Sequence, residues 1–321
     1  MRGYSRVLVT GGAGFIGSHL VDRLLGEGFE VVVLDDFSSG RVENLKHHFG
    51  RDGFVLVRGD VRDKDVVRRV VEGVDVVFHL AALVSVPVSV ENPVLVEDVN
   101  VGGTLNVLKA CVDVGVKRFV FAGSCAVYGE GRGVPRCEDD VLDPISPYGV
   151  SKLAGEFYCR VFYRVYGLET VVLRFFNVYG PRQVYGPYSG VISIFINRLL
   201  GGKSPVIFGD GNQVRDFVYV GDVVEANFLA MFSKNGVGEV FNVGSGRCTS
   251  INELARLLIE LMDVDVEPVY SDPRPGDIRY SCADIGKARR VLGFEPKVGL
   301  REGLLETIAW FREIYGERNV L

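Results

Sequence analysis

The feature that most constrains this chain is a glycine-rich turn that joins an apolar run to a helical pattern close to the first residue. Val7–Thr10 is the apolar run, the turn is Gly11-Gly12-Ala13-Gly14-Phe15-Ile16-Gly17, and amphipathic His19–Leu25 follows. Positions without side chains let the backbone turn sharply and approach a pyrophosphate, while the start of a helix offers free N–H groups and the positive end of its dipole. Strand, glycine turn and helix in this order predict a dinucleotide-binding unit.

The first half of the chain continues to alternate short apolar runs with helical patterns. The runs are rich in valine and do not alternate with polar residues, as is typical of strands buried on both faces. Strands that alternate with helices predict an α/β fold built on a doubly wound parallel sheet of the Rossmann type. The predicted strands are Val7–Val9, Val31–Leu34, Phe54–Val57, Val74–His79, Phe119–Ala122 and Val171–Arg174.

The pattern changes after about residue 177, where loops rich in glycine, proline and tyrosine begin. We therefore expect two domains. Residues 1–176, completed by parts of 215–243, would bind the dinucleotide, and residues 177–321 would form a second, smaller α/β lobe for the substrate. Its predicted elements are strands at Val206–Gly211, Arg215–Val220 and Val240–Val243 and helices at Asp222–Phe232 and Ile251–Leu261.

An acidic residue points to the kind of dinucleotide. The second predicted strand ends in Asp35, 18 residues after Gly17. A carboxylate there binds a ribose 2′-hydroxyl and repels a 2′-phosphate, which favours NAD over NADP, although the nearby Arg41 leaves NADP open. Two further strand ends fit the same pocket: Gly59-Asp60-Val61 beside the adenine, and His79-Leu80-Ala81-Ala82 beneath the pyrophosphate and the nicotinamide ribose.

A second motif supplies candidate catalytic groups. In Ser146-Pro147-Tyr148-Gly149-Val150-Ser151-Lys152, a capping serine and a proline begin a helix that places Tyr148 and Lys152 on one face. A tyrosine that acts as a base near neutrality needs its pKa lowered by about 3 units, and a neighbouring ammonium and the nicotinamide charge act in that direction. Ser124, at the end of a predicted strand, can bind the same substrate oxygen. The alternative is an ordinary helix with an exposed tyrosine and lysine.

The composition excludes several other classes. The net charge of −5 comes without a basic stripe, which disfavours nucleic acid as a partner. No apolar run reaches the ~20 residues of a membrane span, and the N-terminus lacks a signal peptide. The six cysteines form no C-x-x-C, and the histidines are scattered apart from His47-His48. We therefore expect no metal site, reduced thiols and a cytoplasmic location.

These motifs resemble the extended short-chain dehydrogenase/reductase superfamily, and the similarity is closest to the UDP-glucose (UDP-galactose) 4-epimerase family. It covers nearly the whole chain. The matching stretches are Thr10–Ser18, Asp60-Val61, Asn100–Thr104, Ser124–Gly129, Pro147–Lys152, Arg174–Pro181, Gly209–Val220 and Arg274–Asp284. The resemblance implies a 4-epimerase of UDP-hexoses that forms a 4-keto intermediate and holds NAD tightly without consuming it.

The resemblance also assigns roles to residues. Ser124, Tyr148 and Lys152 would be catalytic. The expected cofactor contacts are Gly11, Gly14, Phe15, Ile16, Gly17, Asp35, Asp36, Ser39, Gly40, Asp60, Val61, Leu80, Ala81, Ala82, Asn100, Tyr148, Lys152, Phe176 and Val178. The expected contacts with the UDP-sugar are Ser85, Ser124, Asn177, Val191, Val206, Phe208, Arg215, Arg274, Asp277 and Ser281.

Arg215 and Arg274 suit a diphosphate clamp, because guanidinium groups bind phosphate in a bidentate way. The alternative for each is a surface ion pair with a neighbouring aspartate. Related dehydratases and decarboxylases carry carboxylates just after the catalytic serine, where this chain has Cys125 and Ala126. Another nucleotide-sugar oxidoreductase, dehydratase or decarboxylase remains the alternative enzyme, and a nucleotide-sensing binding protein the non-enzymatic one.

Two finer expectations follow from the same resemblance. Ser281 occupies the position at the far wall of the sugar pocket, where a small residue admits N-acetylated hexoses. In addition, the helical segments Asn100–Val114 and Tyr148–Tyr166 carry more apolar residues than one buried face needs, and family members pair such helices across a two-fold axis. We therefore expect a homodimer. The surplus residues are Val107, Leu108, Phe157, Val161 and Phe162.

Overall fold

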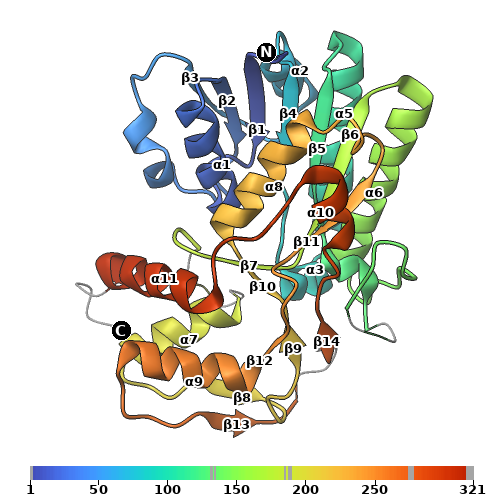
Figure 1. The fold of residues 1–321 in the computed structure, drawn as a ribbon. Helices are drawn as coiled ribbons and strands as arrows, with labels where there is room; N and C mark the ends of the chain where they lie inside the picture. The colour runs from blue at the N-terminus through green and yellow to red at the C-terminus, as the bar shows by residue number, and fades with distance from the viewer. Residues whose placement is uncertain are drawn as a thin grey trace.

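The computed structural model describes residues 3–130, 133, 135–183, 186, 190–273 and 278–315. Its centre is a seven-stranded parallel sheet in the order β11-β6-β5-β4-β1-β2-β3 (Figure 1). These strands are β1 (Arg6–Thr10), β2 (Glu30–Asp35), β3 (Phe54–Arg58), β4 (Val76–His79), β5 (Arg118–Ser124), β6 (Glu169–Phe175) and β11 (Val240–Val243). The prediction of a doubly wound α/β fold is confirmed.

Helices cover both faces of this sheet. One face packs against α1 (Phe15–Gly26), α8 (Val220–Phe232) and α10 (Gly286–Leu292), and the other against α2 (Lys64–Val71), α5 (Gly103–Val114) and α6 (Pro147–Tyr166). Alternate residues of β1 serve the two layers: Val7 and Val9 join one core and Leu8 the other. Burial on both faces explains why the strands read as continuous valine-rich runs.

The elements after residue 177, apart from α8, β11 and α10, build a smaller layer below the sheet (Figure 1). Three helices, α7 (Val191–Leu200), α9 (Ile251–Met262) and α11 (Leu300–Tyr315), share a third apolar core. The accompanying strands are β7 (Asn177–Tyr179), β8 (Val206–Phe208), β9 (Val214–Arg215), β10 (Phe217–Tyr219), β12 (Thr249–Ser250), β13 (Val269–Ser271) and β14 (Tyr280–Ser281). The chain returns from this layer to the large sheet, where β11 pairs with β6.

The predicted strand Arg215–Val220 is wrong in one respect, because β9 and β10 divide it at Asp216. The Asp216 carboxylate is fully buried and accepts hydrogen bonds from the backbone N–H groups of Ser245 (2.6 Å), Gly246 (2.9 Å) and Ala283 (3.2 Å). The strand breaks where this carboxylate holds three loops together, and apolar periodicity does not report such a contact.

The remaining short elements follow the carboxyl ends of β2, β4 and β5. They are α3 (Val86–Glu91), α4 (Pro93–Glu97), the 3₁₀ turns η1 (Val42–Asn44), η2 (Lys46–His48) and η4 (Cys125–Tyr128), and a π-helical turn, η3 (Asp98–Gly102). No described helix is long and apolar enough to cross a bilayer.

The expectation of reduced thiols is wrong for two cysteines. Cys248 and Cys282 form a disulfide, with their Cα atoms 5.5 Å apart and a separation of 34 positions in sequence. They come together because β12 and β14 flank β9 in a three-stranded sheet, and each cysteine directly adjoins one flanking strand. That pairing depends on the tertiary arrangement, which the cysteine spacing does not reveal.

Candidate active site

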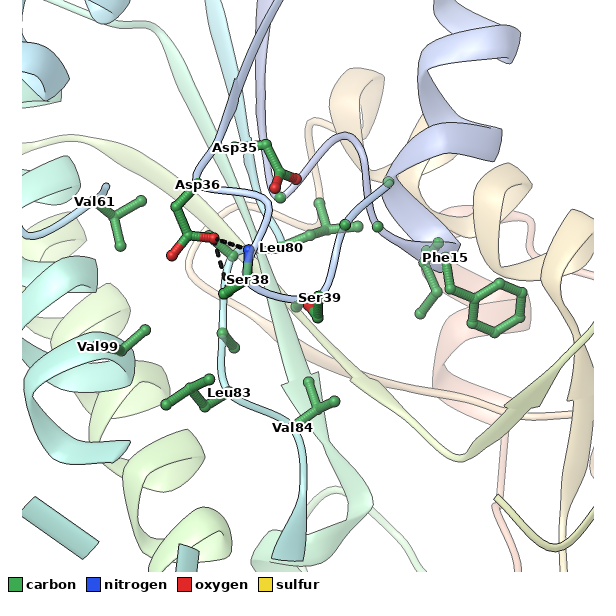
Figure 2. A pocket seen from close by; sticks show the side chains of 18 of the residues that line it. Phe15, Asp35, Asp36, Ser38, Ser39, Val61, Leu80, Leu83, Val84 and Val99 are labelled. Atoms are coloured by element: carbon green, nitrogen blue, oxygen red, sulfur yellow. Dashed lines mark hydrogen bonds between the residues drawn. The ribbon is translucent and has the colours of Figure 1, made fainter. Parts of the chain in front are cut away.

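A cavity of about 1080 Å³ lies at the carboxyl ends of the sheet strands. Parallel α/β sheets bind ligands at this edge. Figure 2 shows side chains from several elements pointing into it, including Phe15, Asp36 and Val61. The predicted residues that line it are Gly11, Gly14, Phe15, Ile16, Gly17, Asp35, Asp36, Ser39, Gly40, Asp60, Val61, Leu80, Ala81, Ala82, Ser124, Tyr148, Lys152, Phe176 and Val178.

The conformation of the glycine turn leaves no room for a side chain at Gly11 or Gly17. Gly11 has φ +69°, and a Cβ atom there would lie 2.8 Å from the backbone nitrogen of Ala81. A Cβ on Gly17 would lie 2.2 Å from the carbonyl oxygen of Gly11. Helix α1 begins directly after Gly14, and no side chain caps it. Its first residues line the cavity, so their backbone N–H groups are available to a ligand there. The turn therefore forms a cradle that fits a dinucleotide diphosphate.

Asp35 ties this turn to the next strand. Its carboxylate accepts hydrogen bonds from the backbone N–H groups of Ala13 (2.9 Å) and Phe37 (2.8 Å). Burial raises the pKa of Asp35, and these two hydrogen bonds oppose that shift. The neighbouring Asp36 is exposed and binds Ser38 (Figure 2). Both carboxylates line the part of the cavity where a ribose hydroxyl would lie.

The three predicted catalytic residues meet at one end of the cavity. Ser146 caps α6 by accepting a hydrogen bond from the backbone N–H of Gly149 (3.1 Å), as its sequence predicts. This start of the helix places Tyr148 close to Ser124, whose side chain acts to lower the pKa of the phenol. Lys152 is 4% exposed, and its Nζ donates to the carbonyl oxygen of Ala122 at 2.9 Å.

Burial shifts the pKa values of Tyr148 and Lys152, and both shifts disfavour the charged form of the side chain. Burial raises the pKa of Tyr148 to about 12, and the hydrogen bond with Ser124 opposes that shift. Burial also lowers the pKa of Lys152 to about 8. A buried phenol becomes a base near neutrality only if positive charge stands beside it, and a nicotinamide ring bound in this cavity carries that charge.

A row of buried hydrogen bonds joins Thr10, His79, Thr104 and Asn100. The position of each proton follows from which groups can only donate and which can only accept. The hydroxyl of Thr104 donates to the carbonyl oxygen of Asn100 (2.5 Å), so it accepts from Nε2 of His79 (2.9 Å). Nδ1 of His79 therefore accepts from the hydroxyl of Thr10 (2.8 Å). Burial and the charge of Lys152 lower the pKa of His79 to about 3, which keeps this ring neutral.

Asn100 belongs to this support and not to the cavity wall. Its side chain donates to the carbonyl oxygen of Leu83 (3.0 Å) and to Oγ of Ser151 (2.9 Å), and it accepts from the N–H of Leu83 (2.8 Å). The Ser151 hydroxyl donates to the carbonyl oxygen of Tyr148 (2.8 Å). Asn100 does not line this cavity, and its polar atoms are bound within the protein, so its contact with the cofactor stays a prediction.

Most of the predicted substrate residues lie outside this cavity. Arg274 and Asp277 fall outside the described residues. Ser85 caps α3, and the others lie on elements of the smaller layer: Asn177, Val191, Val206, Phe208, Arg215 and Ser281.

Two of these residues approach the catalytic end through Cys125. The hydroxyl of Ser281 donates to Sγ of Cys125 at 3.9 Å. Burial raises the pKa of Cys125 to about 11, and this hydrogen bond and the charge of Arg215 oppose that shift. Ser281 and Arg215 are neighbours on paired strands, so β9 and β14 bring both of them near Cys125, the residue that follows Ser124.

Sequence patterns missed several residues that line the cavity. Arg182 and Gln183 follow β7 in a loop that covers one side of it, and no motif marked them. Other missed lining residues are Leu34, Phe37, Ser38, Asn44, Arg62, Leu83, Val88, Leu95, Ala122, Gly123, Phe175, Gly186 and Gly190. Most of them adjoin predicted strand ends, so a wider window around each strand end would have found them.

The described residues also bring Asp22, His47 and His48 together, with potential metal-ligand atoms within 4.8 Å of one another. Nε2 of His48 is 2.7 Å and Nε2 of His47 2.9 Å from Oδ1 of Asp22. Ligands held 2.0–2.1 Å from a tetrahedral zinc ion stand about 3.3 Å apart. These shorter distances are those of hydrogen bonds, and the absence of a metal stays a prediction.

Comparisons with known proteins agree with this geometry. A UDP-glucose 4-epimerase from Mycolicibacterium smegmatis is 44% identical over 309 residues, which are 96% of this chain and 98% of the relative. The crystal structure of UDP-glucose 4-epimerase from Thermotoga maritima with UDP-glucose is 47% identical, with a TM-score of 0.92, and covers 96% of this chain and 99% of its own.

A UDP-N-acetyl-alpha-D-glucosaminuronate decarboxylase from Bacillus cytotoxicus is 38% identical over 322 residues, which are 96% of this chain and 98% of the relative. The NAD dependent epimerase/dehydratase family matches residues 7–244. The cavity, its glycine cradle and the group of Ser124, Tyr148 and Lys152 lie within the matched range. This chain belongs to the NAD-dependent epimerase/dehydratase family.

Proposed function

We propose that the protein inverts C4 of UDP-hexoses, interconverting UDP-glucose and UDP-galactose and also UDP-GlcNAc and UDP-GalNAc. The observation that carries this proposal is that Ser124, Tyr148 and Lys152 line the same cavity as the glycine cradle for the cofactor. A base and a hydride acceptor on one sugar carbon suit oxidation at that carbon, and a retained cofactor suits the return of the hydride.

The family resemblance suggests the roles of the residues in this reaction. NAD, when bound in the glycine cradle, would supply the reversible hydride transfer at C4. Tyr148 takes the proton of the 4-hydroxyl and gives it back after the 4-keto sugar has turned its other face, and Ser124 holds the same oxygen. Lys152 keeps positive charge near the phenolate. Arg215, with Arg274, holds the diphosphate while the sugar turns, and the remaining predicted substrate residues shape the pocket around it.

The residues that follow Ser124 disfavour dehydration and decarboxylation. Those reactions need an additional acid or base beside the catalytic serine. Cys125 occupies the first position with a thiol whose pKa burial raises to about 11, and Ala126 occupies the next. Neither side chain supplies a carboxylate, which argues against decarboxylation by this chain.

The experiment that tests the proposal is incubation of the purified protein with UDP-glucose, UDP-GlcNAc or UDP-glucuronate, with the products identified by NMR. We expect C4 epimers of the first two without added NAD. The denatured protein should release NAD, because the cofactor is regenerated in each cycle. A decarboxylated pentose product, or a requirement for stoichiometric NADPH, would contradict the proposal.

Ser281 is proposed to admit the N-acetyl group. It is buried and directed towards Cys125, whereas Tyr280 is exposed and Cys282 is held in the disulfide. Ser281→Tyr should lower kcat/KM for UDP-GlcNAc at least ~10-fold and spare UDP-galactose, because a phenol meets only the bulkier sugar. Steady-state kinetics with both substrates measure this effect. Equal losses for both substrates would show that Ser281 does not set the choice.

The pH dependence of the reaction should report Tyr148. Activity requires the phenolate, so the rate falls as pH drops below the pKa of this residue in the NAD-bound enzyme. Lys152→Met removes a neighbouring positive charge, which raises the pKa of Tyr148 and shifts the acid limb of the kcat profile to higher pH. The profiles of both proteins between pH 5 and pH 10, with NAD content determined in parallel, measure the shift. An unchanged limb would assign Lys152 to binding alone.

We also propose a homodimer, with a different set of residues from those first expected. Val107 and Leu108 are fully buried and Phe162 is 7% exposed, so these three residues belong to the core. Phe157 and Val161 on α6 remain 48% and 47% exposed. Exposed valines of α3 and α4, two helices that pack against α6, continue this apolar surface: Val86, Val90 and Val94.

Multi-angle light scattering should give the mass of a dimer at micromolar concentration. Val161→Asp should shift the protein towards monomer, because it places a charge in the apolar interface. Leu305→Asp, which alters an equally exposed residue on α11, is the matched control and should leave the mass unchanged. A monomeric wild-type protein would reject the dimer.

We place the enzyme in the cytoplasm. Disulfides are rare there in most organisms but common inside hyperthermophiles, and two glutamines against 27 arginines is a thermophile-like composition. Alkylation of thiols in lysed native cells, followed by mass spectrometry, would show whether Cys248 and Cys282 are paired in the cell.

A further inference from the structure

Arg182 stands out among the residues that line the cavity. It follows β7 in the turn after Gly180 and has φ +67°, a left-handed backbone that few residues with a side chain adopt. Such strain persists where surrounding contacts enforce it, and it concentrates at functional sites. The proposed epimerase chemistry gives this arginine no role.

One half of the guanidinium group is anchored. NH2 of Arg182 lies 2.8 Å from Oδ2 of Asp22, and the other carboxylate oxygen accepts from both His47 and His48. Burial alone would raise the pKa of Asp22, but hydrogen bonds from His48 and His47 and the charge of Arg182 lower it. Asp22 is thus a charged anchor. Nε2 of His19, on the same helix, donates to the carbonyl oxygen of Pro181 (3.0 Å) and holds the turn itself.

The other half has no partner within the described part of the chain. NH1 of Arg182 is shielded from solvent and makes no hydrogen bond there. A buried N–H of a cationic group without a partner is costly, and such groups in native proteins are usually explained by a ligand or an ion. The anchored geometry therefore leaves one charged donor for something that the protein alone does not provide.

The surroundings indicate what that partner is. Arg182 lines the same cavity as the glycine turn and as Arg41 and Asn44, both of which are hydrogen-bonded to the carbonyl oxygen of Ala13 in that turn. Two other cations of the lining are engaged elsewhere: Arg62 binds Asp60, and Lys152 binds a backbone carbonyl. We infer that Arg182 binds the diphosphate of the bound dinucleotide through NH1, and that Asp22, His47 and His48 position it for that contact.

The test measures binding, so it does not depend on the reaction that the enzyme catalyses. Arg182→Met keeps the length of the side chain and removes the charge, and Arg23→Met is the matched control, since Arg23 is next to Asp22 on α1 but does not line the cavity. Dissociation constants of NAD, ADP-ribose, adenosine and UDP are obtained from ligand-induced shifts of the unfolding temperature of cofactor-depleted protein. NAD retained through gel filtration gives a second readout.

For Arg182→Met we expect affinity for NAD and ADP-ribose to fall roughly ten- to hundredfold, the usual effect of losing a charge-assisted hydrogen bond. Adenosine, which lacks phosphate, should bind as before, and Arg23→Met should bind all four ligands normally. Asp22→Asn should also lower the affinity for NAD, but by less than Arg182→Met. The charge of Arg182 is kept in this variant, and only its ion pair with Asp22 is lost. Unchanged NAD affinity, an equal loss for adenosine, or a loss confined to UDP would each overturn the assignment.

Discussion

Replacing Tyr148 with phenylalanine should lower kcat at least ~10²-fold and leave the fold and the NAD content unchanged, because a positioned general base contributes about 10²–10⁴-fold to the rate. The ring remains in the cavity wall, so only the hydroxyl that faces Ser124 is lost. Turnover of UDP-galactose, measured together with the NAD released on denaturation, separates catalysis from cofactor binding.

Tyr158→Phe is the matched control for this substitution. Tyr158 lies on the same helix, is exposed and does not line the cavity, so its hydroxyl should be dispensable. Near-normal turnover by the Tyr148 variant would remove this residue from the mechanism, and an equal loss in both variants would point to damage of α6 as a whole.

Glu156→Ala should destabilise the protein by about 3–5 kcal/mol, because it leaves a buried guanidinium without its counter-ion. The side chains of Glu156 and Arg174 are 1% and 2% exposed, and two hydrogen bonds of 2.7 and 2.9 Å join them. Arg174 also donates to the hydroxyl of Tyr128 at 2.7 Å, so its displacement would disturb a second buried group. Urea unfolding at neutral pH measures the loss.

An exposed ion pair provides the comparison. NH2 of Arg301 lies 2.7 Å from Oε1 of Glu260, and both side chains are more than half exposed. Glu260→Ala should change the free energy of unfolding by about 0–1 kcal/mol, as for most surface pairs. If the two variants lose similar stability, water reaches the Glu156–Arg174 pair and the helix is not anchored there.

The sequence predicts the parts of this fold in which local pattern and burial agree. The valine-rich strands and the glycine turn were found because burial on both faces and close backbone approach each leave a periodic or positional signal. Val107 and Leu108 were misjudged for a related reason: α5 packs against the sheet and also lies beside α2 and α6, so more of its surface is buried than one face. Hydrophobicity alone does not distinguish a second buried face from an exposed one.

The residues of the candidate site also fall into a group that the sequence predicts and a group that it does not. Residues at strand ends, such as Asp35 and Ser124, were predictable because parallel topology carries every strand's carboxyl end to one edge. Arg182 and the Cys248–Cys282 pair were not, since their partners are determined by loops and by strands of two residues. Contacts of this kind depend on three-dimensional proximity between segments that carry no motif.

The row of hydrogen bonds through His79 has a consequence for how protons move in the site. It begins at a backbone N–H, that of Ala81, which donates to Thr10, and it ends at the carbonyl oxygen of Asn100. Neither end can release or accept a proton, and the imidazole between them is neutral near neutral pH, because its pKa is lowered to about 3. This row of hydrogen bonds therefore carries no charge and cannot conduct a proton. A proton that Tyr148 removes from the sugar cannot leave the site through it.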